Sequence, residues 1–451
     1  MPHIGNEKMS KRVFILLALT GLILVGLLAT PIILRAIPPR YLARLPKPIQ
    51  DIGAPPQTAA LLPTVAVTAD VALLLNTAVP TAVVPPATNT PLPVFALSTA
   101  TPAASPTLPP TFTPPPPTVT PVPIPAAARL EGITHQFQEW NNCGPATLAM
   151  TLSYFGIRTN QTTTAAVLKP NPEDRNVSPE EMAAYVNNQT DLQALTRVNG
   201  DTYTIRRLIA NGFPVILEIG IDPPGEFRWL GWYGHYMLVV AYDDAQQQFW
   251  VYDSWLGTSD EPLQNADADG RDLPYADVDA YWPHFNRNYI VLYEPARATE
   301  VAEIIGDNMD DAVMWQNALQ TVRAETAAAP DNAFNWFNLG TAYNTLGQYQ
   351  EAAGAFDQAL AIGLPWRMLW YQFGPYEAYY QNGRYDDVIL LADVTLENRP
   401  YFEESFYYKG LAEEALGNLA DAQENLQLAA DFNPNFTPAA AALSQIQNGG
   451  S

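Results

Sequence analysis

Residues 142–156 read NCGPATLAMTLSYFG and predict how the central part of the chain folds. Pro145 lies just inside the start of an apolar run with helical periodicity, and Gly156 lies just past its end. This placement is typical of a helix, here of about 12 residues. It puts Cys143 at the helix N-terminus, where unpaired backbone N–H groups and the helix dipole favour a thiolate. Because the chain has one cysteine, an internal disulfide and a multi-thiolate zinc site are excluded, and the thiol is a candidate nucleophile.

The segments that follow carry helix signals first and strand signals afterwards. Ser178 to Glu181 form a capping box with proline at the first helical position, and a further helix ends at Gly212. Apolar runs typical of strands come next, over 214–220, 235–242, 248–255 and 289–295. Helices followed by antiparallel strands predict an α+β fold for residues 129–297.

Two of these strands bring a histidine and a carboxylate together. A three-residue turn that pairs Tyr242 with Gln246 places His235 opposite Asp253 on one face. A loop of two or four residues would place Ser254 there instead. A cysteine, a histidine and a carboxylate that orients the imidazole form a nucleophile–base–orienter set.

The spacing of these residues is similar to that of a known family. The run Gln138-x-x-x-x-Cys143-Gly144-Pro145-Ala146, with Gly234-His235-Tyr236 and Asp253 following it, resembles the papain-like cysteine peptidases. It is most similar to family thirty-nine, the enzymes that trim double-glycine leaders from bacteriocins, and to their stand-alone relatives. The resemblance covers residues 129–297 and implies a papain-like cysteine peptidase fold without a cofactor.

The resemblance also implies a role for each matching residue. Cys143 is expected to be the nucleophile, His235 the general base and acid, and Asp253 the orienting carboxylate. Gln138 is expected to donate its side-chain amide to the oxyanion, beside the backbone N–H of Cys143. The glutamine of the family usually stands about six residues before the cysteine, whereas Gln138 stands five before it and Gln136 seven, so both remain candidates.

A second departure follows the carboxylate: Ser254 occupies the position where relatives commonly have proline. His135 is expected to line the cleft wall or cap a segment, and His284 to pack or lie at the surface. The aromatic residues before His235 either line a substrate cleft or pack a loop; they are Trp229, Trp232 and Tyr233. The acidic stretch 265–270 resembles the start of a calcium loop but lacks its final glutamate, which favours a plain surface loop and no metal.

Residues 298–451 contain an internal repeat. Gly347-x-Tyr349 recurs as Gly383-x-Tyr385 and Gly417-x-Leu419. Matching small and aromatic positions are Trp336, Leu339, Gly340, Tyr343, Ala352, Phe356 and Ala359. This pattern resembles the tetratricopeptide (TPR) repeat and implies an all-α solenoid whose concave groove holds a peptide or protein partner. The alternative is that the repeats only brace the neighbouring domain.

The N-terminal part of the chain differs in composition from the rest. Residues 13–34 are an uncharged run of 22 residues, long enough to span a bilayer. We expect an uncleaved transmembrane helix after a cytoplasmic stretch 1–12, with the bulk of the chain outside; a signal peptide is the rival interpretation. Residues 35–128 hold most of the 42 prolines and predict a disordered Pro/Thr-rich stalk.

Charge excludes one class of partner and favours another. The chain has 23 basic and 46 acidic residues, which argues against binding to a nucleic-acid backbone. Residues 298–451 carry 5 basic and 21 acidic side chains, so a basic or neutral partner suits the repeats. The sequence therefore predicts a membrane-anchored thiol peptidase or amidase that acts on peptides, with repeats that recruit a substrate or partner. An inactive papain-like and TPR binding scaffold is the alternative, and acyl transfer through the same thioester is a third hypothesis.

Overall fold

The computed structural model describes residues 30, 61–66, 71–76, 124–174, 176–222, 231–261, 263–265 and 269–449. The predicted membrane anchor 13–34 lies outside these residues except for Thr30. Among the residues that are described, no helix is both long and apolar enough to cross a bilayer.

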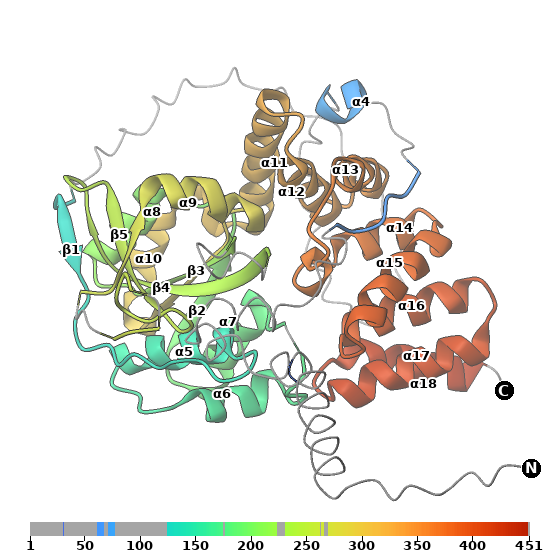
Figure 1. The fold of residues 1–451 in the computed structure, drawn as a ribbon, viewed down its shortest axis with the longest axis horizontal. Helices are drawn as coiled ribbons and strands as arrows, with labels where there is room; N and C mark the ends of the chain where they lie inside the picture. The colour runs from blue at the N-terminus through green and yellow to red at the C-terminus, as the bar shows by residue number, and fades with distance from the viewer. Residues whose placement is uncertain are drawn as a thin grey trace, which may run out of the picture.

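An antiparallel sheet, in which the order of the strands differs from their order along the chain, forms the centre of the first folded unit (Figure 1). Its strands lie in the order β2 (Gln193–Arg197), β7 (Tyr289–Tyr293), β3 (Val215–Ile221), β4 (Tyr233–Asp243), β5 (Gln248–Asp253) and β6 (Arg271–Pro274). Strand β1 (Ala127–Arg129) pairs with the end of β4, beyond the part that pairs with β3. Every one of these pairs is antiparallel, as the α+β prediction requires.

Helices cover both faces of the sheet. One layer holds α5 (Cys143–Tyr154), α6 (Gln161–Leu168) and α7 (Pro179–Gln189); the other holds α8 (Thr202–Ala210), α9 (Tyr275–Tyr281) and α10 (Ala298–Ile305). Alternate side chains of β4 pack against the two helical layers, because successive side chains of a strand point to opposite faces. Tyr236 and Leu238 pack in the core with α5 and α7, while Met237 and Val239 pack in the core with α8. We call β1–β7 with α5–α10 the sheet domain.

The β4–β5 hairpin differs from the predicted register. The turn has four residues between Asp243 and Gln248, and a bulge shifts the register between Val239 and Ala241. Met237, rather than His235, lies opposite Asp253. The predicted three-residue turn was therefore wrong. The bulge restores the side-chain parity that the longer turn removes, so His235 lies diagonal to Asp253 on the same face.

Eight α-helices of the described residues follow and form the second unit, which we call the repeat domain. They are α11 (Asp311–Ala328), α12 (Ala333–Thr345), α13 (Tyr349–Ile362), α14 (Gly374–Gln381), α15 (Tyr385–Asn398), α16 (Glu403–Ala415), α17 (Leu419–Phe432) and a final α18 (Thr437–Gly449) that caps the series. Gly347, Gly383 and Gly417 each adopt positive φ at the turn within a helix pair, which explains why glycine recurs there. Gly340 is required for another reason: a Cβ there would lie 2.6 Å from the Phe356 ring of the paired helix.

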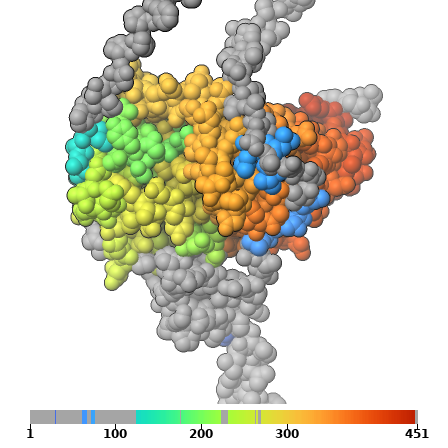
Figure 2. Space-filling model, turned by 90° about the horizontal axis from the view of Figure 1, so that it is seen from above, coloured from blue at the N-terminus to red at the C-terminus, as the bar shows by residue number. Residues whose placement is uncertain are grey.

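Part of the expected stalk is folded onto the repeat domain. Residues 61–66 and helix α4 (Val71–Asn76) lie against it, as the blue segments of Figure 2 show. Leu62 and Leu74 are buried there, and Leu62 N–H donates to the carbonyl of Leu364 at 2.9 Å. The Tyr343 hydroxyl donates to the carbonyl of Leu74. The expectation of a featureless linker over 35–128 fails for these residues because their leucines and valines have an apolar surface to cover.

Candidate active site

Cys143 is the first residue of α5, as the sequence predicts. The start of the helix is seated closely against its neighbours, since a Cβ on Gly144 would lie 3.3 Å from Cβ of Val177 and 3.4 Å from Sδ of Met182. The thiol forms a hydrogen bond with the His235 ring and accepts from the backbone N–H groups of Gly144 and Tyr236. The sulfur is thus held between the helix N-terminus and the first residues of β4.

His235 connects the thiol to a buried carboxylate. Its Nε2 lies 2.8 Å from Oδ1 of Asp253, which leaves Nδ1 for the hydrogen bond with Cys143. Both side chains are buried, with relative exposures of 3% for His235 and 0% for Asp253. The structure therefore brings Cys143, His235 and Asp253 into one hydrogen-bonded chain.

The environment favours an ion pair between the sulfur and the imidazole. Burial opposes ionisation of Cys143, but the hydrogen bond and charge of His235 outweigh it and lower the pKa of the thiol. Burial likewise opposes protonation of His235, but Asp253 and the thiolate raise the pKa of the imidazole to about 10. Between these two pKa values the pair is thiolate and imidazolium, the nucleophilic form of a cysteine.

Asp253 is held by the turn that follows it. Its Oδ1 also accepts the backbone N–H groups of Trp255 at 2.7 Å and Leu256 at 2.9 Å. Its carbonyl lies 2.8 Å from Nε2 of His135, whose Nδ1 lies 3.0 Å from Nδ2 of Asn265. Burial lowers the pKa of His135, which fits a neutral ring that accepts from Asn265 and donates to Asp253. His135 therefore fixes the backbone of the carboxylate residue instead of contacting the thiol.

The two glutamines that the sequence left as alternatives differ in their partners. Both ends of the Gln136 amide bind backbone atoms: Nε2 donates to Thr159 and Oε1 accepts from Gln161. The side-chain Oε1 of Gln138 accepts a hydrogen bond from the Ser254 hydroxyl at 2.9 Å. The backbone N–H of Gln138 donates to the Ser254 carbonyl at 2.6 Å. The bond from the Ser254 hydroxyl fixes the orientation of the Gln138 side-chain amide.

The sequence did not reveal that the repeat domain borders this site. The connection between α13 and α14, residues 363–373, includes the short helix η5 (Met368–Trp370) and lies against the start of β4. Arg367 donates to the carbonyl of Trp232 at 3.0 Å and stacks on Tyr233. A Cβ on Gly234 would lie 2.6 Å from the Phe285 ring and 3.2 Å from the Tyr371 ring, so glycine beside His235 makes room for a residue of each domain.

The fourth histidine stabilises the contact between the domains. His284 stacks on Phe334 of α12 with 3.7 Å between ring centroids, and its Nδ1 accepts from the Trp232 indole at 3.1 Å. Burial lowers the pKa of His284 to about 4, so the ring is neutral at pH 7. Trp232 itself is buried and stacks on Phe285. The sequence left open whether this tryptophan lines a substrate cleft or packs a loop, and the structure supports packing.

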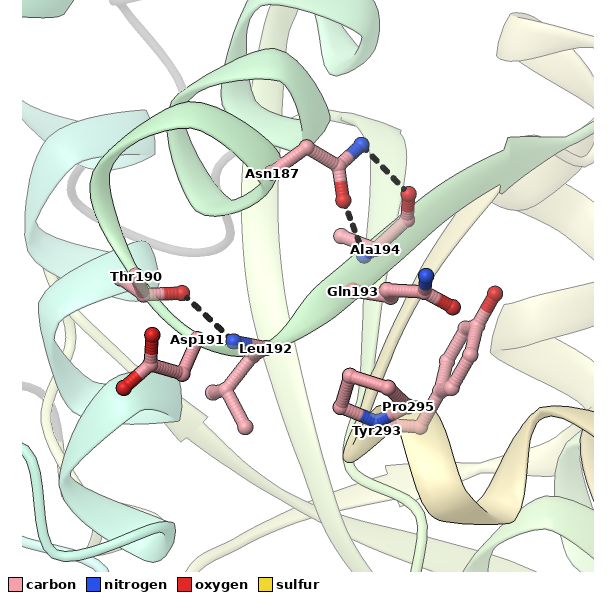
Figure 3. Close-up of a pocket in the computed structure, with 8 residues that line it drawn as sticks. All are labelled: Asn187, Thr190, Asp191, Leu192, Gln193, Ala194, Tyr293 and Pro295. Atoms are coloured by element: carbon pink, nitrogen blue, oxygen red, sulfur yellow. Dashed lines mark hydrogen bonds between the residues drawn. The ribbon is translucent and has the colours of Figure 1, made fainter.

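A separate hollow of about 430 Å³ lies at the edge strand β2 (Figure 3). Asn187 spans part of it with two hydrogen bonds to the backbone of Ala194, and Thr190 accepts from Leu192 N–H. Both side chains thus bind the backbone of this edge, and no cysteine or histidine is among the residues that line the hollow. Within the described residues no cluster of histidine, cysteine and carboxylate side chains could hold a metal ion. Part of the acidic stretch 265–270 lies outside them.

Comparison with known protein families finds one match, over the sheet domain. Residues 130–288 match the profile of the Peptidase_C39 like family. A solved structure described as a C39-like peptidase from Bacillus anthracis is 15% identical, with 37% of this chain and 97% of that chain covered and a TM-score of 0.29. MamA residues 41 to the end, from Desulfovibrio magneticus RS-1, is 17% identical, with coverages of 30% and 85% and a TM-score of 0.25. No curated protein matches the chain. Together with the repeat pattern, the profile match identifies a C39-like domain followed by TPR-like helices.

Proposed function

We propose that the protein is a thiol peptidase or amidase that hydrolyses an amide bond of a peptide. The observation that carries this proposal is the hydrogen-bonded chain from Cys143 through His235 to Asp253, with the pKa of the thiol lowered and that of the imidazole raised. The match of residues 130–288 to a peptidase-like family supports the same chemistry.

The reaction follows from the positions of the groups. The Cys143 thiolate attacks the carbonyl carbon, and the resulting oxyanion accepts from the Cys143 backbone N–H and the Gln138 amide. The His235 imidazolium donates its proton to the leaving amine, which departs and leaves a thioester. His235 then takes a proton from water, the hydroxide attacks the thioester, and the carboxylic acid leaves as the thiolate is restored. Asp253 keeps the imidazole oriented through both steps.

The proposal also covers the rest of the chain. The repeat domain recruits a peptide or a partner protein, as its helix pairs and acidity suit a basic or neutral chain. The uncharged residues 13–34 support a single membrane anchor, with the folded units outside the membrane.

The test is the rate at which an electrophilic peptide probe labels the single cysteine of the full chain as a function of pH. We expect wild type to be labelled below the ordinary pKa of a thiol, because His235 lowers the pKa of Cys143. His235→Ala removes the histidine that opposes the effect of burial, so the pKa of the thiol should rise. Labelling at pH 7 should therefore fall by at least tenfold. Asp279→Asn, an exposed change on α9, is the control and should match wild type.

Two results would contradict the proposal. Equal labelling of wild type and His235→Ala would show that the histidine does not activate the thiol. Peptide binding without cleavage by the wild-type chain would instead favour the inactive scaffold.

A further inference from the structure

The two domains enclose a pocket of about 940 Å³ beside the candidate active site. The sheet domain contributes the start of α7, the end of β2, Glu218, Phe285, Asn286 and Asn288. The repeat domain contributes parts of α11 and α12 and residues 371–374. Glu218 lies opposite Tyr236 on neighbouring strands, one residue from His235. Tyr371 packs on Gly234. Glu218 and Tyr371 both interact electrostatically with Cys143, so the pocket lies near the thiol, and its far wall belongs to the repeats.

The floor of this pocket is rich in hydrogen-bond acceptors. Glu218 is only 3% exposed, and its Oε2 accepts from Nδ2 of Asn288 at 2.6 Å. The side-chain oxygens of Asn286 and Asn288 are buried and find no donor among the described residues. Buried acceptors without donors are costly, so a ligand that brings donors would satisfy them.

The charged residues that line the pocket are mostly acidic. Glu180, Glu218 and Asp311 are acidic, and Arg197 is the basic residue among the lining side chains. The guanidinium of Arg197 already binds Asp311 at 2.7 Å and the carbonyl of Met309 at 3.0 Å. Acidic residues therefore outnumber basic ones in the lining, and a cationic ligand would find carboxyl groups to pair with.

Apolar side chains form the walls above this floor. They are Phe285, Met314, Trp315, Tyr371 and Phe373. An aliphatic stem suits such walls, and a cationic head with several N–H groups suits the acceptors below. Lysine and arginine are the side chains that combine the two.

We infer that this interdomain pocket binds a lysine or arginine side chain of the peptide whose backbone occupies the candidate active site. The inference rests on the proposed function and names its substrate class. Glu218 is the principal partner of the cationic head, and the repeat domain supplies the walls around the stem. The repeats are then part of the substrate site itself, not only a recruiting surface.

The protonation state of Glu218 supports this assignment. Burial raises the pKa of Glu218 to about 8 despite the hydrogen bond from Asn288, so the carboxyl is mostly protonated in the empty pocket at pH 7. A bound ammonium or guanidinium would favour the carboxylate, and the proton would leave to solvent.

The experiment uses the full chain with Cys143→Ala, which binds peptides without cleaving them. A random decapeptide library is selected on this variant and the bound peptides are sequenced. We expect lysine or arginine to be enriched at one position. Replacement of that residue by norleucine in a selected peptide should weaken the Kd at least tenfold. Lack of such enrichment, or equal affinity for the lysine and norleucine peptides, would overturn the inference.

Two further variants test the pocket itself. Glu218→Gln should abolish the preference for lysine over norleucine, whereas Asp279→Asn should keep it. Thr345→Lys adds a cation at an exposed position of the rim and should weaken binding of the lysine peptide alone, even where Glu218→Gln does not fold. A preference that survives both pocket variants would overturn the assignment of the site.

The inference and the proposed function fail in different ways. Cleavage by wild type without a basic preference would overturn only the inference. A basic preference in the Cys143→Ala variant, with no cleavage by wild type, would overturn only the hydrolase.

Discussion

Ser254 links the two sides of the candidate site at the scale of single residues. It follows Asp253 on the chain, and its hydroxyl and carbonyl bind the side chain and backbone of Gln138. The proline common at this position in relatives would have no hydroxyl to donate. In this chain the serine therefore has a positioning role that the sequence alone did not indicate.

Removal of that hydroxyl should reduce catalysis without reducing binding. Ser254→Ala frees the Gln138 oxygen, so the amide is less well oriented toward the oxyanion, which exists only in the transition state. We expect kcat on a cleaved peptide to fall about five- to tenfold with KM unchanged, from the loss of one orienting hydrogen bond. Ser254→Thr keeps a hydroxyl and should restore most of kcat. A rise in KM with unchanged kcat would contradict this role.

The candidate site residues could be predicted because their order along the chain carries the chemistry. His235 and Asp253 lie on one face and are hydrogen-bonded, although the predicted hairpin register was wrong. The reason is that side chains of a strand alternate between its faces. The turn is one residue longer than predicted and the bulge adds one more residue, so His235 and Asp253 stay on the same face but lie diagonal to each other instead of opposite. The support from His135 and Ser254 depends on loop paths, which periodicity does not encode.

At the scale of elements, the least expected feature is the docking of residues 61–66 and α4 on the repeat domain. A proline-rich composition correctly argues against long helices and sheets. It does not exclude a short apolar segment that covers part of a larger unit. Likewise, the repeat period predicted the helix pairs but not the short α14 or the 363–373 connection that reaches the sheet domain.

The two neighbouring leucines of α4 provide a matched test of this docking. Leu74 is 2% exposed against the repeat domain, whereas Leu73 is 63% exposed. Leu74→Ala should lower the free energy of unfolding by about 2 kcal/mol and the melting temperature by about 5 °C. Leu73→Ala should change it by less than about 1 °C, because surface changes alter stability little. Thermal unfolding followed by circular dichroism measures both, and equal shifts would show that α4 does not dock in solution.

At the scale of the whole molecule, the domains meet in a second place away from the candidate site. Asn435, which precedes α18, donates to the carbonyl of Val167 at 2.9 Å. Nearby, Asp174 of the sheet domain and Glu403 at the start of α16 are both buried and interact electrostatically. An acidic chain thus places several carboxyl groups, Glu404 among them, in the contact between its own domains. The sequence showed that the chain and its repeat segment are acidic, but not that these acids would be buried together.

This buried pair should make the domain contact weaker as pH rises. Burial and the neighbouring carboxylate raise the pKa of Asp174 above its ordinary 3.8, and burial raises that of Glu403 above 4.5. The fold therefore favours the protonated forms. Above the ordinary pKa the unfolded chain releases protons that the folded chain retains, so stability falls as pH increases toward the raised values.

Substitution of one carboxyl by its neutral isostere should reduce this dependence. Glu403→Gln keeps the shape and the contact with Asn433 but removes a charge. We expect the melting temperature of the variant to exceed that of wild type at pH 8 and to approach it at pH 5, where the carboxyl is increasingly protonated in wild type. Glu424→Gln, an exposed change on α17, is the control and should follow the wild-type profile. Because Asp174, Glu404 and Glu218 also have raised pKa values, some dependence should persist in Glu403→Gln. A variant profile parallel to wild type at all pH values would mean that Glu403 ionises freely and that solvent reaches the contact.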